Sequence, residues 1–155
     1  TRDDTAGSVF QTLSDLGADL LLETLPHWIA GEIQSQIQDD ALATYAPMLK
    51  KEEGKLDFTH AADELERRVR AFNPWPGAFI DFDGTPLKIQ RAHVEQQNAE
   101  VGQRLIIQNQ PAIGARSGIL ILDEVQPAGK KSMSGKSFLA GARNWASLKS
   151  GGQVA

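Results

Sequence analysis

The residues best suited to chemistry in this chain are three lysines in a glycine- and proline-rich segment: Lys130, Lys131 and Lys136. The segment runs from Gln126 to Lys136, contains no acidic side chain and leads into an expected helix with Ser134 as its N-cap. Lysines bind phosphate as mobile point charges, and the free N–H groups of a helix N-terminus also favour anions. The segment therefore indicates contact with a polyanion, and an ordinary solvated lysine loop is the equally weighted alternative.

A second distinctive segment is Asn73-Pro74-Trp75-Pro76-Gly77. Two prolines and a glycine restrict its backbone, and Trp75 offers a large apolar side chain. We interpret the segment as a rigid corner between a helix and a strand, anchored by Trp75, in preference to a ligand site.

The other reactive residue types form no catalytic or metal-binding pattern. The histidines stand alone at positions 27, 60 and 93, and cysteine is absent. The acid pairs Asp39-Asp40 and Glu52-Glu53 lie in charged stretches, which are more typical of a solvated surface than of an acid–base pair. Phosphate-binding glycine motifs and nucleophile elbows are missing as well. We therefore assign neither a catalytic residue nor a metal ligand.

Charge is distributed unevenly along the 155 residues, whose formal net charge is −4. Residues 1–49 carry one arginine and eight carboxylates, whereas residues 125–155 carry five basic and no acidic side chains. Fields decay within ~8 Å at physiological salt, so the basic end suits a polyanion although the whole chain is acidic. No apolar run approaches the ~20 residues of a membrane span, and no signal peptide is present, so we expect a cytoplasmic protein without membrane contact.

Three helices are expected to position these segments, over residues 5–30, 60–72 and 135–146. In the first, apolar residues recur at helical spacing from Val9 to Ile29, with a break near Gly17 and a kink at Pro26. In the second, Thr59 is the expected N-cap. Residues 32–57 show no sustained period and indicate a linker with one or two short extended pieces.

From residue 78 onward the hydrophobic period changes to two, which is typical of strands. Strands are expected at 78–82, 87–95, 103–108, 112–116 and 119–125, with Asp83-Gly84 as a hairpin turn. Five short antiparallel strands with helices at hand favour a small closed barrel, because closure removes exposed strand edges. A glycine-rich, frayed tail is expected from Ser150.

Taken together, these segments resemble the C-terminal half of the methionyl-tRNA formyltransferases. The resemblance rests on the order and spacing of residues 4–8, 43–54, 70–79, 87–89, 126–135 and 138–139. It covers nearly the whole chain, and residues 50–54, 70–77 and 126–135 are specific in combination.

The resemblance implies an α+β fold. Residues 1–31 would be the terminal helices of a truncated Rossmann-like formyltransferase domain, and residues 32–58 would be the linker. Residues 59–155 would be an OB-like, five-stranded antiparallel β-barrel with flanking helices. The chain begins at Thr1 and its first methionine is Met48, so we expect a piece of a longer protein.

The resemblance also implies an activity for the parent, the transfer of a formyl group from 10-formyltetrahydrofolate to the methionyl amino group of initiator tRNA. The family's catalytic motifs lie before Thr1, so this chain should be inactive alone, bind no folate and contribute tRNA binding as a monomer. By motif match, Lys50 and Lys51 join Lys130, Lys131 and Lys136 as candidate phosphate contacts.

Two alternatives remain open. In the first, the parent is a related formyltransferase that acts on a sugar amine, or a formyl-folate hydrolase. In the second, the chain is a stand-alone OB-type oligonucleotide-binding module, although such a module has no need of the apolar helix at residues 5–30.

Overall fold

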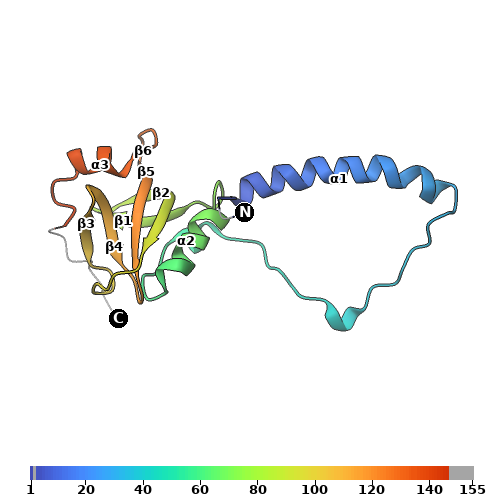
Figure 1. Ribbon diagram of the computed structural model, residues 1–155, viewed down its shortest axis with the longest axis horizontal. Helices are drawn as coiled ribbons and strands as arrows, with labels where there is room; N and C mark the ends of the chain where they lie inside the picture. Colours follow the sequence, from blue (N-terminus) through green and yellow to red (C-terminus); the bar gives the residue numbers. More distant parts are fainter. Residues whose placement is uncertain (2, 147–155) are drawn as a thin grey trace.

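The architecture is a curled antiparallel sheet flanked by helices, with one long helix projecting away from it (Figure 1). The structure is a computed structural model that describes Thr1 and residues 3–146. The predicted α+β class and the antiparallel sheet with flanking helices are confirmed. The tail expected from Ser150 lies outside the described residues.

Helix α1 (Ala6–Ile29) is continuous, so the predicted break near Gly17 is wrong and the helix runs through Pro26 without a restart. Thr5 caps its N-terminus as the capping pattern indicates, accepting from the Ser8 N–H. The helix passes Pro26 because α1 buries no side chain, and water can therefore bond the carbonyl that proline leaves without a partner. Gly31 follows the helix with a φ of 74°, the left-handed conformation that ends many helices.

The segment after α1 has no extended strand of its own among the described residues. It contains two short 3-10 helices, η1 (Asp40–Leu42) and η2 (Lys51–Gly54), and returns to the sheet beneath α1 (Figure 1). It joins the sheet through one parallel bridge between Lys55 and Phe79, where the Leu56 N–H donates to the Phe79 carbonyl at 2.9 Å. Leu56 is buried in the core, so the end of this segment packs as part of the barrel.

Helix α2 (Ala62–Ala71) buries Leu65 and Val69 against β2 and β5. Its N-cap is Ala61 and not the predicted Thr59. The reason is tertiary: the Ala62 N–H donates to the carbonyl of Ser117, far along the chain, at 2.9 Å. Two i,i+4 ion pairs form along α2, Glu64–Arg68 and Glu66–Arg70.

Six strands form one antiparallel sheet in the order β1-β2-β5-β4-β3, with β6 on β5. Their bounds are β1 (Ala78–Phe82), β2 (Thr85–Glu95), β3 (Arg104–Ile107), β4 (Gln110–Gly114), β5 (Ile119–Pro127) and β6 (Met133–Ser134). The five predicted strands are all present, and β6 was not predicted. Asp83 and Gly84 both have positive φ, 50° and 74°, as the predicted two-residue hairpin requires.

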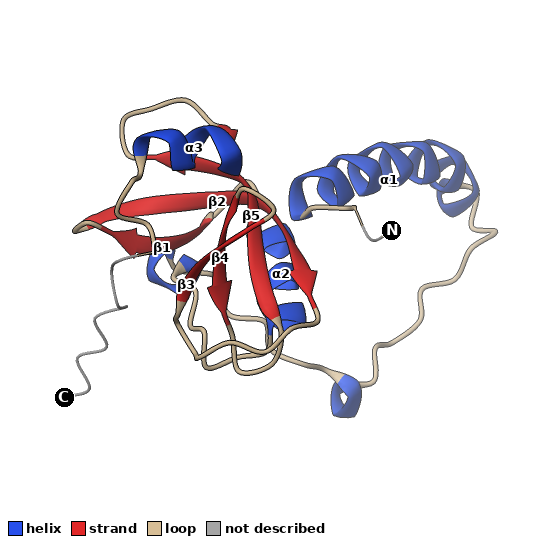
Figure 2. Cartoon of the chain, turned by 60° about the vertical axis from the view of Figure 1, so that its left-hand side comes forward, coloured by secondary structure: helices blue, strands red, loops and turns tan. Residues whose placement is uncertain are grey.

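The sheet curls around one main apolar core, with α2 along one side and α3 (Gly135–Gly141) across one end (Figure 2). The described residues form no hydrogen-bonded ladder between β1 and β3, the two ends of the strand order. Arg104 of β3 spans this gap, since its Nη2 donates to the carbonyl of Asp81 at 2.8 Å. Its guanidinium carbon lies 5.2 Å from the ring centres of both Phe82 and Trp145.

Trp145 closes the same end of the barrel from outside any helix. Helix α3 ends at Gly141, earlier than the predicted residue 146, and the chain then turns inward. The Trp145 side chain is fully buried, packs against Phe138 and Phe82, and donates from Nε1 to the Leu105 carbonyl at 2.8 Å.

Candidate nucleic-acid interface

The lysine segment is the tip of a hairpin between β5 and β6. The Lys130 N–H donates to the Pro127 carbonyl at 3.0 Å, and Gly129 supplies the positive φ of the turn. The Gln126 side chain braces the loop from below by donating to the Lys130 carbonyl at 2.9 Å. Lys130 and Lys131 are thus exposed on a loop whose base is held by hydrogen bonds.

Lys88 lies beside this loop and was missed by the sequence analysis. It is exposed on β2 between buried Leu87 and Ile89, and its direct cross-strand partner is Gln126. Alternation along the strand was the signal available, because it already placed Lys88 on the outer face. The same face carries Gln90, whose Nε2 donates to Gln126 Oε1 at 3.1 Å.

The corner at residues 73–77 adjoins Lys88. A Cβ added at Gly77 would lie 4.0 Å from Lys88 Cε, so the lysine stem runs past this glycine. The corner is closed by the Gly77 N–H, which donates to the Phe72 carbonyl at 2.9 Å. The Asn73 side chain also ties it to β2 by donating to the Gln90 carbonyl at 3.2 Å.

Trp75 does not serve as the buried anchor that we expected. Its side chain is 55% exposed, while the neighbouring Pro76 is buried and holds the loop to the barrel. The corner is therefore fixed by Pro76 and by its hydrogen bonds, and the tryptophan is left facing solvent.

Lys50 and Lys51 reach the same corner through η2. Gly54 at the end of η2 is buried, and a Cβ there would lie 2.2 Å from the Gly77 carbonyl oxygen. Only a glycine permits this approach of two backbones. Lys51 opens η2 and Lys50 is its N-cap, so both lysines belong to the short segment that Gly54 holds against the corner.

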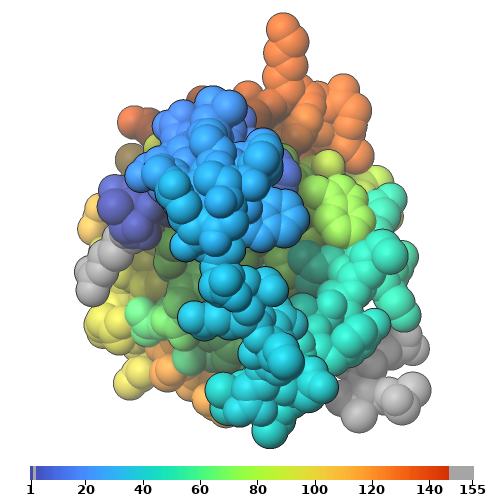
Figure 3. Space-filling view, turned by 90° about the vertical axis from the view of Figure 1, so that its right-hand side faces the viewer, coloured from blue at the N-terminus to red at the C-terminus, as the bar shows by residue number. Residues whose placement is uncertain are grey.

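These contacts join the segments that carry five exposed lysines along one side of the molecule. We call this surface the basic face, and it consists of Lys50, Lys51, Lys88, Lys130 and Lys131. In Figure 3 the orange loop, the yellow-green corner segment and the turquoise linker segment follow one another down the right-hand side. Two nearby acids are engaged locally, since Glu53 accepts from the Lys50 N–H and Glu124 accepts from Ser132 Oγ at 2.6 Å.

Lys136 takes no part in the contacts that join the other five lysines. It is exposed in the first turn of α3, which packs on β4, β5 and β6 and also touches β1 through the ring contact of Phe138 with Phe82. The Ser134 side chain already accepts from the Ser137 N–H at 3.1 Å, so this helix start is capped by the chain itself.

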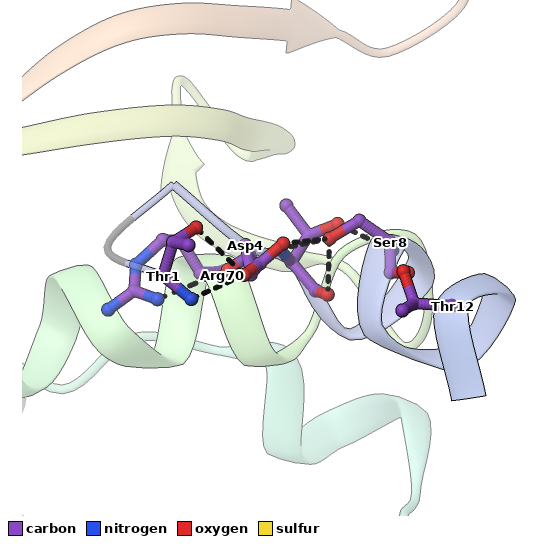
Figure 4. A network of polar contacts seen from close by, with 6 residues as sticks. Thr1, Asp4, Ser8, Thr12 and Arg70 are labelled. Carbon is purple, nitrogen blue, oxygen red and sulfur yellow. Dashed lines mark hydrogen bonds and ion pairs between the residues drawn. The ribbon is translucent and has the colours of Figure 1, made fainter. Parts of the chain in front are cut away.

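The start of α1 is attached to α2, as Figure 4 shows, and the Gly7 N–H attaches it to the corner by donating to the Asn73 carbonyl. Arg70 on α2 donates from Nη1 to the Asp4 carbonyl at 3.1 Å, while Ser8 Oγ donates to the Asp4 carboxylate at 3.0 Å. Hydrogen bonds from the Thr1 ammonium, and then from the Thr1 and Ser8 side chains, lower the pKa of Asp4 to about 2. Glu66 raises the pKa of Arg70, chiefly by its hydrogen bond.

The histidines each face a carboxylate in separate places. His27 pairs with Glu32, His60 with Glu64 and His93 with Asp123. The hydrogen bond from His60 is the main cause that lowers the pKa of Glu64. His93 and Asp123 line a cleft of about 700 Å³ between α2, the start of α1 and the outer face of β2 and β5. No group of three metal-ligating side chains occurs among the described residues.

No helix in the described part of the chain is both long enough and apolar enough to cross a membrane.

The curled antiparallel sheet with its flanking helices is the fold of a formyltransferase C-terminal domain. Solved structures of HypX from Aquifex aeolicus share it. A multiply substituted variant matches 79% of this chain with a TM-score of 0.61 at 19% identity, and the complex with tetrahydrofolic acid matches 78% with a TM-score of 0.59 at 19% identity. The chain spans 22% of the length of either HypX chain.

Residues 48–143 match the family described as Formyl transferase, C-terminal domain. This match covers more than half of the chain, and the chain belongs to that family.

Proposed function

We propose that this chain is the C-terminal part of a methionyl-tRNA formyltransferase and that its basic face holds the tRNA. The parent protein would transfer a formyl group from 10-formyltetrahydrofolate to the methionyl amino group of initiator tRNA. The chain itself would contribute RNA binding and no catalytic group, and it would do so as a monomer in the cytoplasm.

The observation that carries this proposal is the basic face. Lys50, Lys51, Lys88, Lys130 and Lys131 come from the linker, the sheet and a hairpin that are far apart in sequence, and contacts through Gly54, Gly77 and Gln126 bring them to one side. Several lysines spaced along one surface suit the repeating phosphates of a nucleic acid better than a single small anion.

A folate co-substrate for the parent is supported by the HypX relative that is in complex with tetrahydrofolic acid. We propose that this co-substrate binds in the part of the parent protein that lies outside this chain. Accordingly, we expect no formylation of methionyl-tRNA by the purified chain, and measurable formylation would contradict this division of labour.

The test measures tRNA affinity as a function of salt for the wild-type chain and for the double variant Lys130→Ala/Lys131→Ala. Removing one lysine from a phosphate should flatten the slope of log K against log salt by about one, so the double variant should flatten it by up to about two. Affinity for initiator and elongator tRNA should fall by similar factors, because lysines act as point charges and do not discriminate bases.

The control is Arg67→Ala/Arg116→Ala, which removes two exposed positive charges outside the basic face. It should leave the salt slope nearly unchanged. If the lysine variant kept the wild-type affinity and salt slope, the loop would be an ordinary solvated connector. If the variant lost affinity only for initiator tRNA, the loop itself would discriminate between tRNAs. Failure of the wild-type chain to bind any tRNA would favour a formyltransferase with another acceptor.

A further inference from the structure

Trp75 is an exposed aromatic side chain without an assigned role. Among the described residues matched by the family, 48–143, it is the one large aromatic side chain that is mostly exposed, at 55%. The other aromatic residues of this region are buried or half-buried. An aromatic ring left in water on a small domain is the unusual observation here, because burial would stabilise the fold.

The loop that carries Trp75 is fixed by three hydrogen bonds to other parts of the chain. The Gly77 N–H closes it onto the Phe72 carbonyl, the Asn73 side chain ties it to β2, and the Asn73 carbonyl accepts from the Gly7 N–H at 3.0 Å. Pro74 and Pro76 flank the tryptophan and restrict its backbone. A side chain presented on a fixed loop loses little conformational entropy when it binds a ligand.

The surroundings of Trp75 point to the kind of ligand. Its loop lies between Lys88, which passes Gly77, and η2 with Lys51, which packs on Gly77 through Gly54. The exposed indole is therefore carried by a loop that lies between two of the segments that form the basic face. A flat aromatic ring between phosphate-binding lysines is the arrangement with which proteins hold unpaired nucleotides, since the lysines follow the backbone and the ring stacks on a base.

We infer that Trp75 stacks on an unpaired base of the RNA bound to the basic face. This inference rests on the proposed function and adds a requirement to it: the ligand must present at least one unstacked base next to its phosphates, as loops and single-stranded ends of RNA do and a blunt duplex does not.

The test replaces Trp75 by leucine, which keeps an apolar side chain and removes the aromatic ring. Loss of one stacked base should weaken tRNA binding about five- to hundred-fold. The salt slope should stay at the wild-type value, because tryptophan carries no charge. Trp75→Phe should restore part of the affinity, and binding of a blunt RNA duplex should be the same for all three proteins.

The chain offers a matched control in Trp28, which is 59% exposed on α1 and away from the basic face. Trp28→Leu should leave tRNA affinity unchanged. Intrinsic fluorescence gives a second readout: in the Trp28→Phe background, tRNA should quench the emission of exposed Trp75, and this quenching should vanish in Trp28→Phe/Trp75→Phe, where buried Trp145 remains.

The outcomes separate this inference from the proposed function. A Trp75→Leu protein that binds tRNA within twofold of wild type, or that loses duplex binding equally, overturns the stacking role while the lysine contacts stand. A wild-type chain that binds no RNA overturns both. Thermal unfolding of Trp75→Leu should match wild type, because more than half of the replaced side chain is exposed.

Discussion

The backbone N–H of Gly7 donates to the carbonyl of Asn73 at 3.0 Å, so the first turn of α1 is bonded directly to the corner that carries Trp75. A Cβ at Gly7 would stand 3.0 Å from Pro74 Cδ, which is tighter than nine in ten real Cβ contacts. Together with the bond from Arg70 to Asp4, this contact sets the direction in which α1 leaves the barrel.

We expect Gly7→Val to detach the start of α1 from the corner without unfolding the barrel. The branched side chain crowds Pro74 and should push the two segments apart, whereas the barrel core contains no residue of α1. Amide exchange should speed up at residues 5–9, and the distribution of distances between labels on α1 and β2 should broaden. Gly17→Val is the matched control, because nothing lies within 4 Å of a Cβ at Gly17. Equal behaviour of the two variants would show that the contact does not orient α1.

Trp145 should be the most costly single truncation of the C-terminal segment. Trp145→Ala removes a fully buried ring from between Phe82 and Phe138 and should lower the free energy of unfolding by about 3–5 kcal/mol. Trp145→Phe keeps a ring but removes the bond to the Leu105 carbonyl, and it should cost less. Denaturant unfolding gives both values. Trp28→Ala, at an exposed position, should stay within about 0.5 kcal/mol of wild type.

Asp57 should make the stability of the barrel depend on acidity. Hydrogen bonds from Thr59, first from its backbone N–H at 2.9 Å and then from its side chain, lower the pKa of Asp57 in the folded chain. A carboxyl with a depressed folded pKa contributes stability above its unfolded pKa of about 4, and this contribution is lost as pH falls through the folded value.

The difference in unfolding midpoint between wild type and Asp57→Asn should therefore be constant at neutral pH and shrink below about pH 4. Denaturant titrations from pH 7 to pH 3 measure it. Asp40→Asn, an exposed linker change, serves as the comparison. A difference between wild type and Asp57→Asn that stays the same down to pH 3 would contradict this role of the carboxylate.

Amide hydrogen exchange should be much faster in α1 than in β5. Helix α1 buries no side chain among its 24 residues, so its amides should exchange rapidly in the isolated chain. Amides of Leu120 and Leu122 in β5 should be the slowest, because β5 is paired on both sides and these side chains are completely buried. Mass spectrometry of peptides from α1 and β5 measures the contrast. Similar protection of both would mean that α1 is held along its length and not by its first turn alone.

Local patterns in the sequence were sufficient for most elements of the barrel. The hydrophobic period of two predicted the strands, and Asp83-Gly84 predicted the first hairpin, because both features are fixed by neighbouring residues. Thr59 failed as a helix cap because the competing bond comes from Ser117, a residue that only the fold brings near. Strand β6 was missed for the same reason, since two residues paired with Glu124 and Val125 leave no periodic signal.

The candidate interface was only half predictable. Composition indicated Lys130 and Lys131, and motif resemblance added Lys50 and Lys51, but no local pattern joined them to Lys88. That connection depends on Gly54 meeting Gly77, a contact between residues 23 positions apart that no spacing rule contains. Trp75 was misjudged because large apolar side chains are usually buried, and its exposure follows from the orientation of the corner.

The back-to-back contact of Gly54 and Gly77 has a mechanical consequence. The linker enters the barrel where the corner leads into β1, and the two backbones meet there with no side chain between them. Force applied along the linker would therefore act on the segments of Lys51 and Trp75 together. A ligand bound by these two residues would in turn restrain the linker. Tension in the linker and ligand binding at Lys51 and Trp75 would therefore be mechanically coupled through the contact of Gly54 with Gly77.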